Sequence, residues 1–91
     1  MCRNIRVLYN FAPPTTKEEI HAAALQYVRK VTGVRAPSLA DREEFERTVG
    51  AIAASTEQIL ASLKARAPVR TREAEREKGR ARWKVREARA R

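Results

Sequence analysis

The residues with the clearest chemical potential are the arginines near the C-terminus, which have one tryptophan among them. From Arg66 to Arg91 the chain has eleven Lys or Arg against four Glu, whereas residues 1–65 have nine basic and seven acidic residues. Arginine binds phosphate through paired N–H donors, and tryptophan offers a flat face on which an unstacked base can lie. A polycationic segment of this kind is typical of proteins that bind a polyanion.

The spacing of these residues places most of them on one side of a predicted helix. Five residues fall within about a 120° sector at 100° per residue, namely Arg72, Arg76, Arg80, Trp83 and Arg86. With Arg82 and Lys84 they form the set that we expect to bind nucleic acid. RNA is favoured over DNA, because no helix-turn-helix spacing is present and a helix that is basic all round suits phosphate and shape recognition.

Two other interpretations of this segment stay open. It could be a solvated helix that is supported by Glu–Arg pairs, with Trp83 packed on the rest of the protein. It could also bind an acidic protein. A membrane surface is disfavoured, since Trp83 and Val85 supply too little apolar area for an interfacial helix.

The only candidate nucleophile is Cys2, the single cysteine. Arg3 and Arg6 would favour its thiolate, but nucleophilic catalysis also requires a positioned base. The sole histidine, His21, lies at an unknown distance from it. The two residues would supply only half of a closed zinc site, so we expect no catalytic residue, metal or cofactor.

Other signatures of an enzyme are missing. The sequence has no glycine-rich phosphate loop and no G-x-S-x-G nucleophile elbow. Its glutamates gather where helices are predicted to start, and capping and the helix dipole explain them there. We therefore predict that the protein is not an enzyme.

Three general features favour a cytoplasmic protein. A single cysteine cannot form an internal disulfide bond, which suits a reducing compartment. No apolar run approaches the ~18 residues that a membrane-spanning helix needs. The N-terminus also lacks the apolar region of a signal peptide.

The pattern predicts a compact body over residues 1–65 and a basic helical arm over residues 66–91. Alternating apolar residues indicate an extended segment at 4–11, which Pro13 and Pro14 end. Thr16 and Glu19 form a capping box for a helix over 17–32, and Gly33 suits the position just past its end. Its predicted apolar stripe consists of Ile20, Ala24, Tyr27, Val28 and Val31.

A second helix is predicted over 39–65, with Ser38 and Asp41 as its capping box. Its apolar positions alternate at spacings of four and three, as in the a and d positions of a heptad. They are Phe45, Val49, Ile52, Thr56, Ile59 and Leu63, widened by Leu39, Ala53 and Leu60. This face can pack on the first helix, and a homodimer is the alternative use for it.

The predicted fold class is all-α: a two-helix hairpin with a short extended N-terminal segment and a long basic C-terminal helix. Thr71 can cap the third helix near Arg72, and no apolar stripe is available to dock that helix on the body. Tyr9, Phe11 and Tyr27 could form a stacking platform for bases. Their periodicity favours a place in the core instead.

The chain also resembles a known family. Met1-Cys2-Arg3-Asn4-Ile5, Asn10-Phe11-Ala12-Pro13-Pro14 and the stretch from Ala22 to Lys30 are similar to the small bacterial family named domain of unknown function 2277. Pro37-Ser38 and Arg70-Thr71-Arg72-Glu73 also follow its pattern, while Thr32 stands where the family commonly has Ser. The resemblance implies a cytoplasmic bacterial protein of about this size and supplies no activity.

Two functions are therefore expected from the sequence. The first is a small nucleic-acid-binding protein that uses the basic C-terminal helix. The alternative is a structural or regulatory interaction module that dimerises through the second helix and binds an acidic partner.

Overall fold

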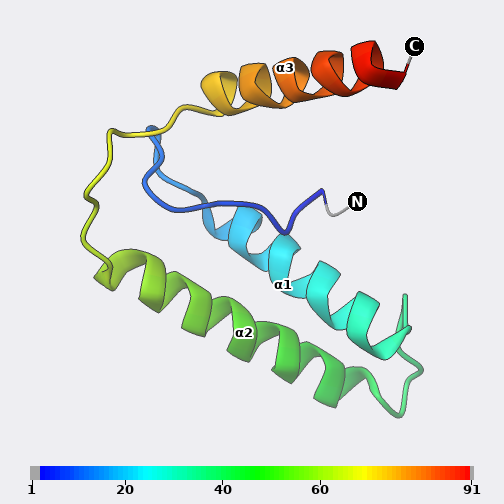
Figure 1. The fold of residues 1–91 in the computed structure, drawn as a ribbon. Coiled ribbons are helices and arrows are strands. Elements are labelled where there is room, and N and C mark those ends of the chain that lie inside the picture. The colour runs from blue at the N-terminus through cyan, green and yellow to red at the C-terminus, as the bar shows by residue number, and fades with distance from the viewer. Residues whose placement is uncertain (1–2, 91) are drawn as a thin grey trace.

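The computed structural model describes residues 3–90, and within them the chain forms three helices and no strand. They are α1 (Lys17–Thr32), α2 (Arg42–Ser62) and α3 (Arg72–Ala90). The expectation of an all-α fold is confirmed, with a third helix in addition to the hairpin of α1 and α2. Figure 1 shows the order of the layers: α2, then α1, then the N-terminal segment, then α3.

The ends of α1 follow the caps that the sequence predicts. The Thr16 hydroxyl accepts a hydrogen bond from the Glu19 backbone N–H at 3.1 Å, and the Glu19 carboxylate accepts one from the Thr16 N–H at 2.9 Å. At the other end, Gly33 has φ +72° and its N–H donates to the Arg29 carbonyl at 2.9 Å. Both ends of the helix are thus satisfied by residues within four positions of them.

Two glycine-to-alanine substitutions are expected to change stability in opposite directions. Gly33→Ala should lower the free energy of unfolding by ~1 kcal/mol, because a side chain disfavours the left-handed region. Gly50 lies inside α2, and an added Cβ would have nothing within 4 Å of it. Gly50→Ala should therefore raise the free energy of unfolding by ~0.5–1 kcal/mol. Urea unfolding followed by circular dichroism measures both, and shifts of the same sign would contradict these backbone assignments.

The second helix is shorter at both ends than the predicted 39–65. The Ser38 hydroxyl donates to the Asp41 carboxylate at 3.1 Å instead of capping the helix, and Asp41 makes no side-chain cap. The chain turns here, so Leu39 precedes the helix and is 82% exposed. At the far end the extended backbone of Leu63 stops the helix well before Pro68.

The core lies between α1 and α2. Ala24, Val28 and Val49 form its buried cluster, and partly buried side chains pack against them: Leu25, Phe45, Ile52 and Ala53. The first half of the apolar face of α2 is therefore used by α1. Ile59 and Leu63, at its far end, remain 53% and 52% exposed.

The predicted stripe of α1 is only partly correct. Ile20, Ala24 and Val28 are buried as expected, but Tyr27 is 49% exposed and Val31 is 66% exposed. Successive residues of a helix are 100° apart, so Tyr27 lies away from the Val28 face that α2 covers. The placement of Tyr27 in the core was wrong.

The N-terminal segment is not a strand. Its backbone N–H groups at Asn4 and Ile5 donate to the Gln26 side-chain oxygen at 2.8 and 3.1 Å, rather than to a neighbouring strand. The predicted alternation also fails, since Leu8 is buried while Ile5 and Val7 are 42% and 55% exposed. A side chain of α1 thus positions this segment in place of a β-ladder.

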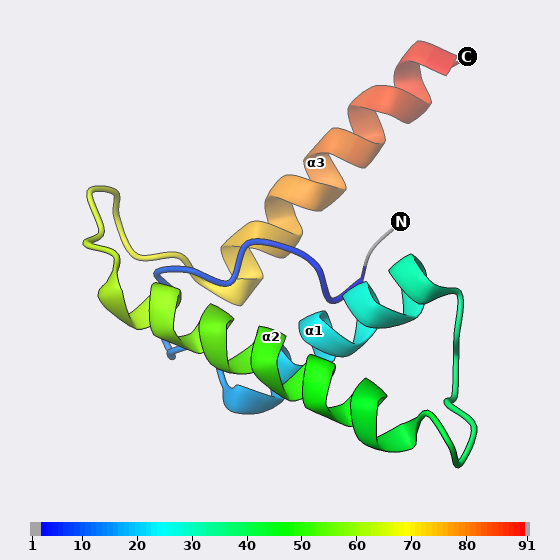
Figure 2. The same ribbon diagram turned by 90° about the horizontal axis from the view of Figure 1, so that it is seen from below.

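The third helix projects from the hairpin, as Figure 2 shows. None of its residues is buried, and the molecule is flat, with extents of 49 × 38 × 16 Å. Its start is capped as predicted, because the Ala74 N–H donates to the Thr71 hydroxyl at 3.1 Å. No helix within residues 3–90 is long and apolar enough to cross a membrane.

Candidate nucleic-acid interface

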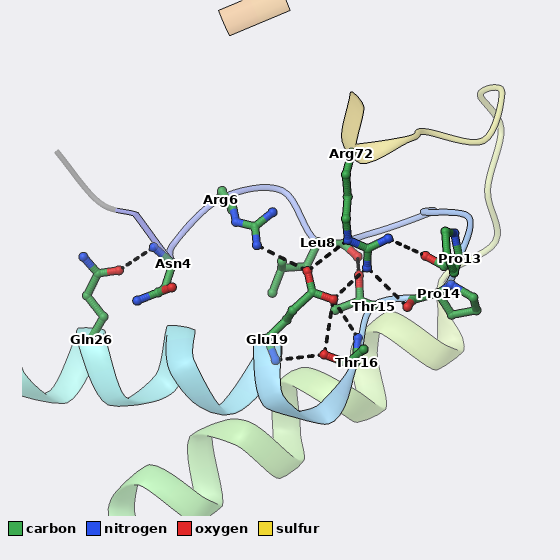
Figure 3. Close-up of polar contacts among 10 residues, drawn as sticks. All are labelled: Asn4, Arg6, Leu8, Pro13, Pro14, Thr15, Thr16, Glu19, Gln26 and Arg72. Carbon is green, nitrogen blue, oxygen red and sulfur yellow. Dashed lines mark hydrogen bonds and ion pairs between the residues drawn. The ribbon is translucent and has the colours of Figure 1, made fainter. Parts of the chain in front are cut away.

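The first turn of α3 is attached to the hairpin by one arginine. The Arg72 guanidinium donates to both carboxylate oxygens of Glu19, at 2.7 and 3.3 Å. It also donates to the carbonyls of Pro13 at 2.9 Å and Pro14 at 3.3 Å, and it lies 5.4 Å from the centre of the Phe11 ring. Figure 3 shows Arg72 reaching from α3 to the start of α1.

Glu19 is the common partner of this attachment. Besides Arg72 and Thr16, it accepts a hydrogen bond from Arg6 on the N-terminal segment at 3.2 Å. The hydrogen bond from Arg72, followed by that from the Thr16 backbone, lowers the pKa of Glu19 from 4.5 to about 2. The same contact raises the pKa of Arg72. One carboxylate therefore joins α1, α3 and the N-terminal segment.

A second attachment lies just before α3. The Arg70 N–H donates to the Asn10 carbonyl at 2.8 Å, and the Ala12 N–H donates to the Arg70 carbonyl at 2.9 Å. The Asn10 side chain donates to the carbonyls of Ala67 and Pro68, both at 3.1 Å. Asn10 has φ +63°, a conformation that asparagine tolerates better than most residues. The base of α3 is thus held by hydrogen bonds rather than by apolar packing.

The structure divides the predicted nucleic-acid-binding residues into two groups. The Arg72 guanidinium is bound by Glu19 and by two backbone carbonyls. Arg72 is therefore not part of the exposed surface of α3. The other six are exposed: Arg76, Arg80, Arg82, Trp83, Lys84 and Arg86. Trp83 is 63% exposed and does not pack on the hairpin, and Arg80 forms an ion pair with Glu77 one turn earlier.

Two of the exposed arginines, Arg76 and Arg82, line a cavity together with residues of the N-terminal segment. The cavity, which we call the arginine hollow, has a volume of about 620 Å³. It is lined by Arg3, Arg6, Val7, Phe11, Arg72, Glu75, Arg76 and Arg82. Sequence reasoning did not place Arg3 and Arg6 beside α3, because nothing in the linear pattern brings them there.

A second basic cavity lies on the other side of Arg3, at the end of α1. It has a volume of about 580 Å³ and is lined by Arg3, Asn4, Ala22, Leu25, Gln26, Arg29, Lys30, Gly33 and Arg35. The Arg29 side chain donates to the Arg35 carbonyl at 2.9 Å, which closes the loop after α1. Positive charge is therefore not confined to the arm but extends over the N-terminal segment.

The predictions about Cys2 fall outside the described residues. His21 is exposed on α1 and borders a cavity between the two helices of the hairpin. Within residues 3–90, no group of three or more His, Cys, Asp or Glu is arranged to hold a metal ion.

Comparison with known proteins gives one match. No curated protein and no solved structure is significantly similar to the chain. The family model described as "Uncharacterized conserved protein (DUF2277)" matches residues 1–78. The match includes the hairpin, Glu19, Arg70 and Arg72, and it ends one residue before Gly79. Because it spans most of the sequence, this protein belongs to the DUF2277 family.

Proposed function

We propose that the protein binds single-stranded nucleic acid, RNA in preference to DNA, along the exposed face of α3. The observation that carries the proposal is a set of arginines on this helix that form no ion pair within the protein. Within residues 3–90, Arg76, Arg82 and Arg86 form no ion pair, whereas Arg70 and Arg72 do. Unpaired arginines of this kind bind phosphates by displacing condensed counterions.

The stability of α3 also favours an external partner. It has no buried residue, and Gly79 lies near its middle. Most of the stability of a protein helix comes from packing of an apolar face, which α3 lacks, and glycine costs about 1 kcal/mol relative to alanine. A polyanion that neutralises the arginines would stabilise the helix by removing their mutual repulsion.

Trp83 is the reason for preferring a single strand. Its ring is 63% exposed on α3, among the arginines that would contact phosphate. Bases stack on aromatic side chains only when they are free of a duplex. The exposed ring therefore supports an unpaired strand, and 2′-hydroxyl groups can add hydrogen bonds to the arginines in RNA.

The alternative function is an interaction module that dimerises through α2 and binds an acidic protein. Ile59 and Leu63 support it, because they extend the apolar face of α2 beyond the part that α1 covers. Two half-exposed side chains bury little area for a dimer. Sedimentation at high protein concentration measures this directly, and a monomer would rule out the dimer version.

Replacement of the tryptophan tests the proposed function. Trp83→Ala is expected to weaken the binding of a fluorescein-labelled single-stranded RNA by about tenfold, since stacking contributes ~1–3 kcal/mol per base. The fluorescence of Trp83 should also change when unlabelled RNA is added. Fluorescence anisotropy with the full chain gives the dissociation constant, and circular dichroism checks the helix content of each variant.

Val85→Ala is the matched control. Val85 is also apolar and half-exposed on α3, two residues further along, but it has no face for stacking. Its replacement should leave the affinity within about twofold of the original. Equal binding by the Trp83→Ala and Val85→Ala variants, with no change in tryptophan fluorescence, would exclude stacking on Trp83.

A further inference from the structure

We propose that the arginine hollow binds the phosphate monoester of a nucleotide, with the nucleoside lying over the apolar wall that Val7 and Phe11 provide. The phosphate can come from the phosphorylated end of a nucleic-acid strand or from a free nucleotide. The first source deepens the proposed function and rests on it. The second does not depend on it.

The hollow keeps an excess of positive charge. Five arginines line it against one glutamate, Glu75. That glutamate already pairs with Arg70 at 3.3 Å and lies 3.9 Å from Lys78, neither of which lines the hollow. Behind the wall, Glu19 pairs with Arg6 and Arg72.

Glu75 and Glu19 are thus already engaged, and three of the arginines that line the hollow are not. Within the described residues, Arg3, Arg76 and Arg82 have no ion-pair partner. They come from two segments that face each other across the hollow, the N-terminal segment and α3. An anion between them would receive charge-assisted hydrogen bonds from both sides.

The size and the wall of the hollow also suit a nucleotide. A volume of about 620 Å³ lies within the range of about 300–1,000 Å³ that small-molecule sites span. Val7 is 55% exposed, and Phe11 is partly exposed, with the Arg72 guanidinium 5.4 Å from its ring centre. Apolar and aromatic side chains beside a guanidinium suit a nucleobase, which stacks on both kinds of surface.

A glycine lies between two of the lining arginines on α3. Gly79 lies 60° round the helix from Arg76 on one side and from Arg82 on the other, as follows from 100° per residue. A Cβ at Gly79 would meet nothing nearer than the end of the Arg82 side chain at 4.0 Å. At the position between Arg76 and Arg82, which both line the hollow, α3 therefore carries no side chain.

A monoester should be preferred to the diesters within a strand. A terminal phosphate carries about −1.5 to −2 charges at pH 7 and has three acceptor oxygens. A diester carries one charge. Several guanidinium groups around one cavity discriminate between the two more strongly than a row of arginines along an open helix does.

The test compares ligands that differ only in the terminal phosphate. Single-stranded RNA decamers with a 5′-phosphate, a 3′-phosphate or no terminal phosphate are titrated with the full chain, as are adenosine 5′-monophosphate and adenosine. At least one terminal phosphate should tighten binding about tenfold or more relative to its unphosphorylated counterpart. No increment for the decamers or for the mononucleotide would overturn the proposal.

An uncharged substitution then tests whether the gain in affinity from the terminal phosphate arises in the hollow. Gly79→Leu adds a bulky side chain between Arg76 and Arg82 without changing charge, and it should abolish the phosphate increment. Gly79→Ala is the control, because its Cβ fits the available space and the increment should persist. Both residues favour helix over glycine, so unfolding of α3 would not explain a loss, and an increment that survives Gly79→Leu would refute this location.

The outcome also separates this site from the proposed function. Phosphate-dependent binding of adenosine 5′-monophosphate, without binding of the unphosphorylated decamer, would support the hollow and reject the exposed face of α3. Binding of all decamers with equal affinity would support the exposed face of α3 and reject the hollow. An increment for decamers but not for the mononucleotide would identify a strand end as the source.

Discussion

The affinity for single-stranded RNA is expected to fall by roughly a hundredfold to a thousandfold between 50 and 200 mM salt. The logarithm of the binding constant decreases by about 0.7 per neutralised phosphate for each decade of salt. Five of the predicted binding residues are exposed cations on α3: Arg76, Arg80, Arg82, Lys84 and Arg86. Five to seven phosphate contacts, with Arg3 and Arg6 as the additional donors, give a change of this size.

Charge reversal in the full chain tests whether α3 causes the salt dependence. The quantity compared is the slope of the logarithm of the binding constant against the logarithm of the salt concentration. Arg86→Glu should reduce the slope and weaken binding at 50 mM salt. Arg47→Glu on α2 changes the net charge equally, far along the chain from the arm, and should have a much smaller effect. A truncation at residue 65 is a poor substitute, because it also removes Arg70 and Arg72, which hold the N-terminal segment.

Two further ligands distinguish the partner class. Single-stranded DNA of the same sequence should bind more weakly than RNA, and a polyglutamate peptide should bind more weakly than either. Affinity for RNA that changes less than tenfold over this salt range would contradict a surface built on phosphate contacts. Tighter binding of polyglutamate would favour the acidic-protein alternative.

The features that could be predicted from the sequence are those fixed by near neighbours. The caps of α1 at Thr16 and Gly33 and the start of α3 at Thr71 depend on contacts over three or four residues. Such contacts can be read from residue type and spacing alone. The same reasoning was wrong at Ser38, where the hydroxyl bonds to the carboxylate of its expected capping partner instead of to the backbone.

What could not be predicted depends on pairs that are far apart in the sequence. Arg72 looks like any other arginine of the basic arm, yet its partner Glu19 is 53 residues away. Glu19 in turn is explained fully by its capping role when only its neighbours are considered. The sequence therefore placed Arg72 in the binding surface, whereas the structure uses it to attach α3.

The N-terminal segment shows the same limit. Alternation of apolar residues predicted an extended segment but not what holds it in place, and within residues 3–90 only Phe11 and Arg70 form a β-bridge. The Gln26 side chain binds the backbone of this segment instead. In this position Arg3 and Arg6 line the arginine hollow together with residues of α3, and no local pattern of the sequence predicts that cavity.

Glu19→Gln is expected to destabilise the protein by ~1–2 kcal/mol at pH 7 and to loosen α3. Glutamine keeps the shape and can still complete the capping box with Thr16, so the substitution removes the charge that Arg6 and Arg72 share. The side chain of Glu19 is 19% exposed and that of Arg72 is 27% exposed. Urea unfolding gives the stability, and faster amide hydrogen exchange in α3 would report its release.

An exposed ion pair of the same length provides the control. Glu44 and Arg47 also lie 2.7 Å apart, but their side chains are 71% and 62% exposed. Glu44→Gln should therefore change the free energy of unfolding by less than ~0.5 kcal/mol, as is usual for surface pairs. Equal effects of the two substitutions would mean that Glu19 does not attach α3.

The pH dependence of the stability difference between the original protein and Glu19→Gln tests whether the charge of Glu19 causes it. The folded-state pKa of Glu19 is lowered from 4.5 to about 2, so its contribution is complete above pH 4.5 and is lost as the pH falls towards 2. A shift of this size corresponds to about 3 kcal/mol, which solvent screening reduces to the ~1–2 kcal/mol expected above. The stability difference between the original protein and Glu19→Gln should thus vanish near pH 2. A difference that persists there would show that the loss comes from packing rather than from the charge.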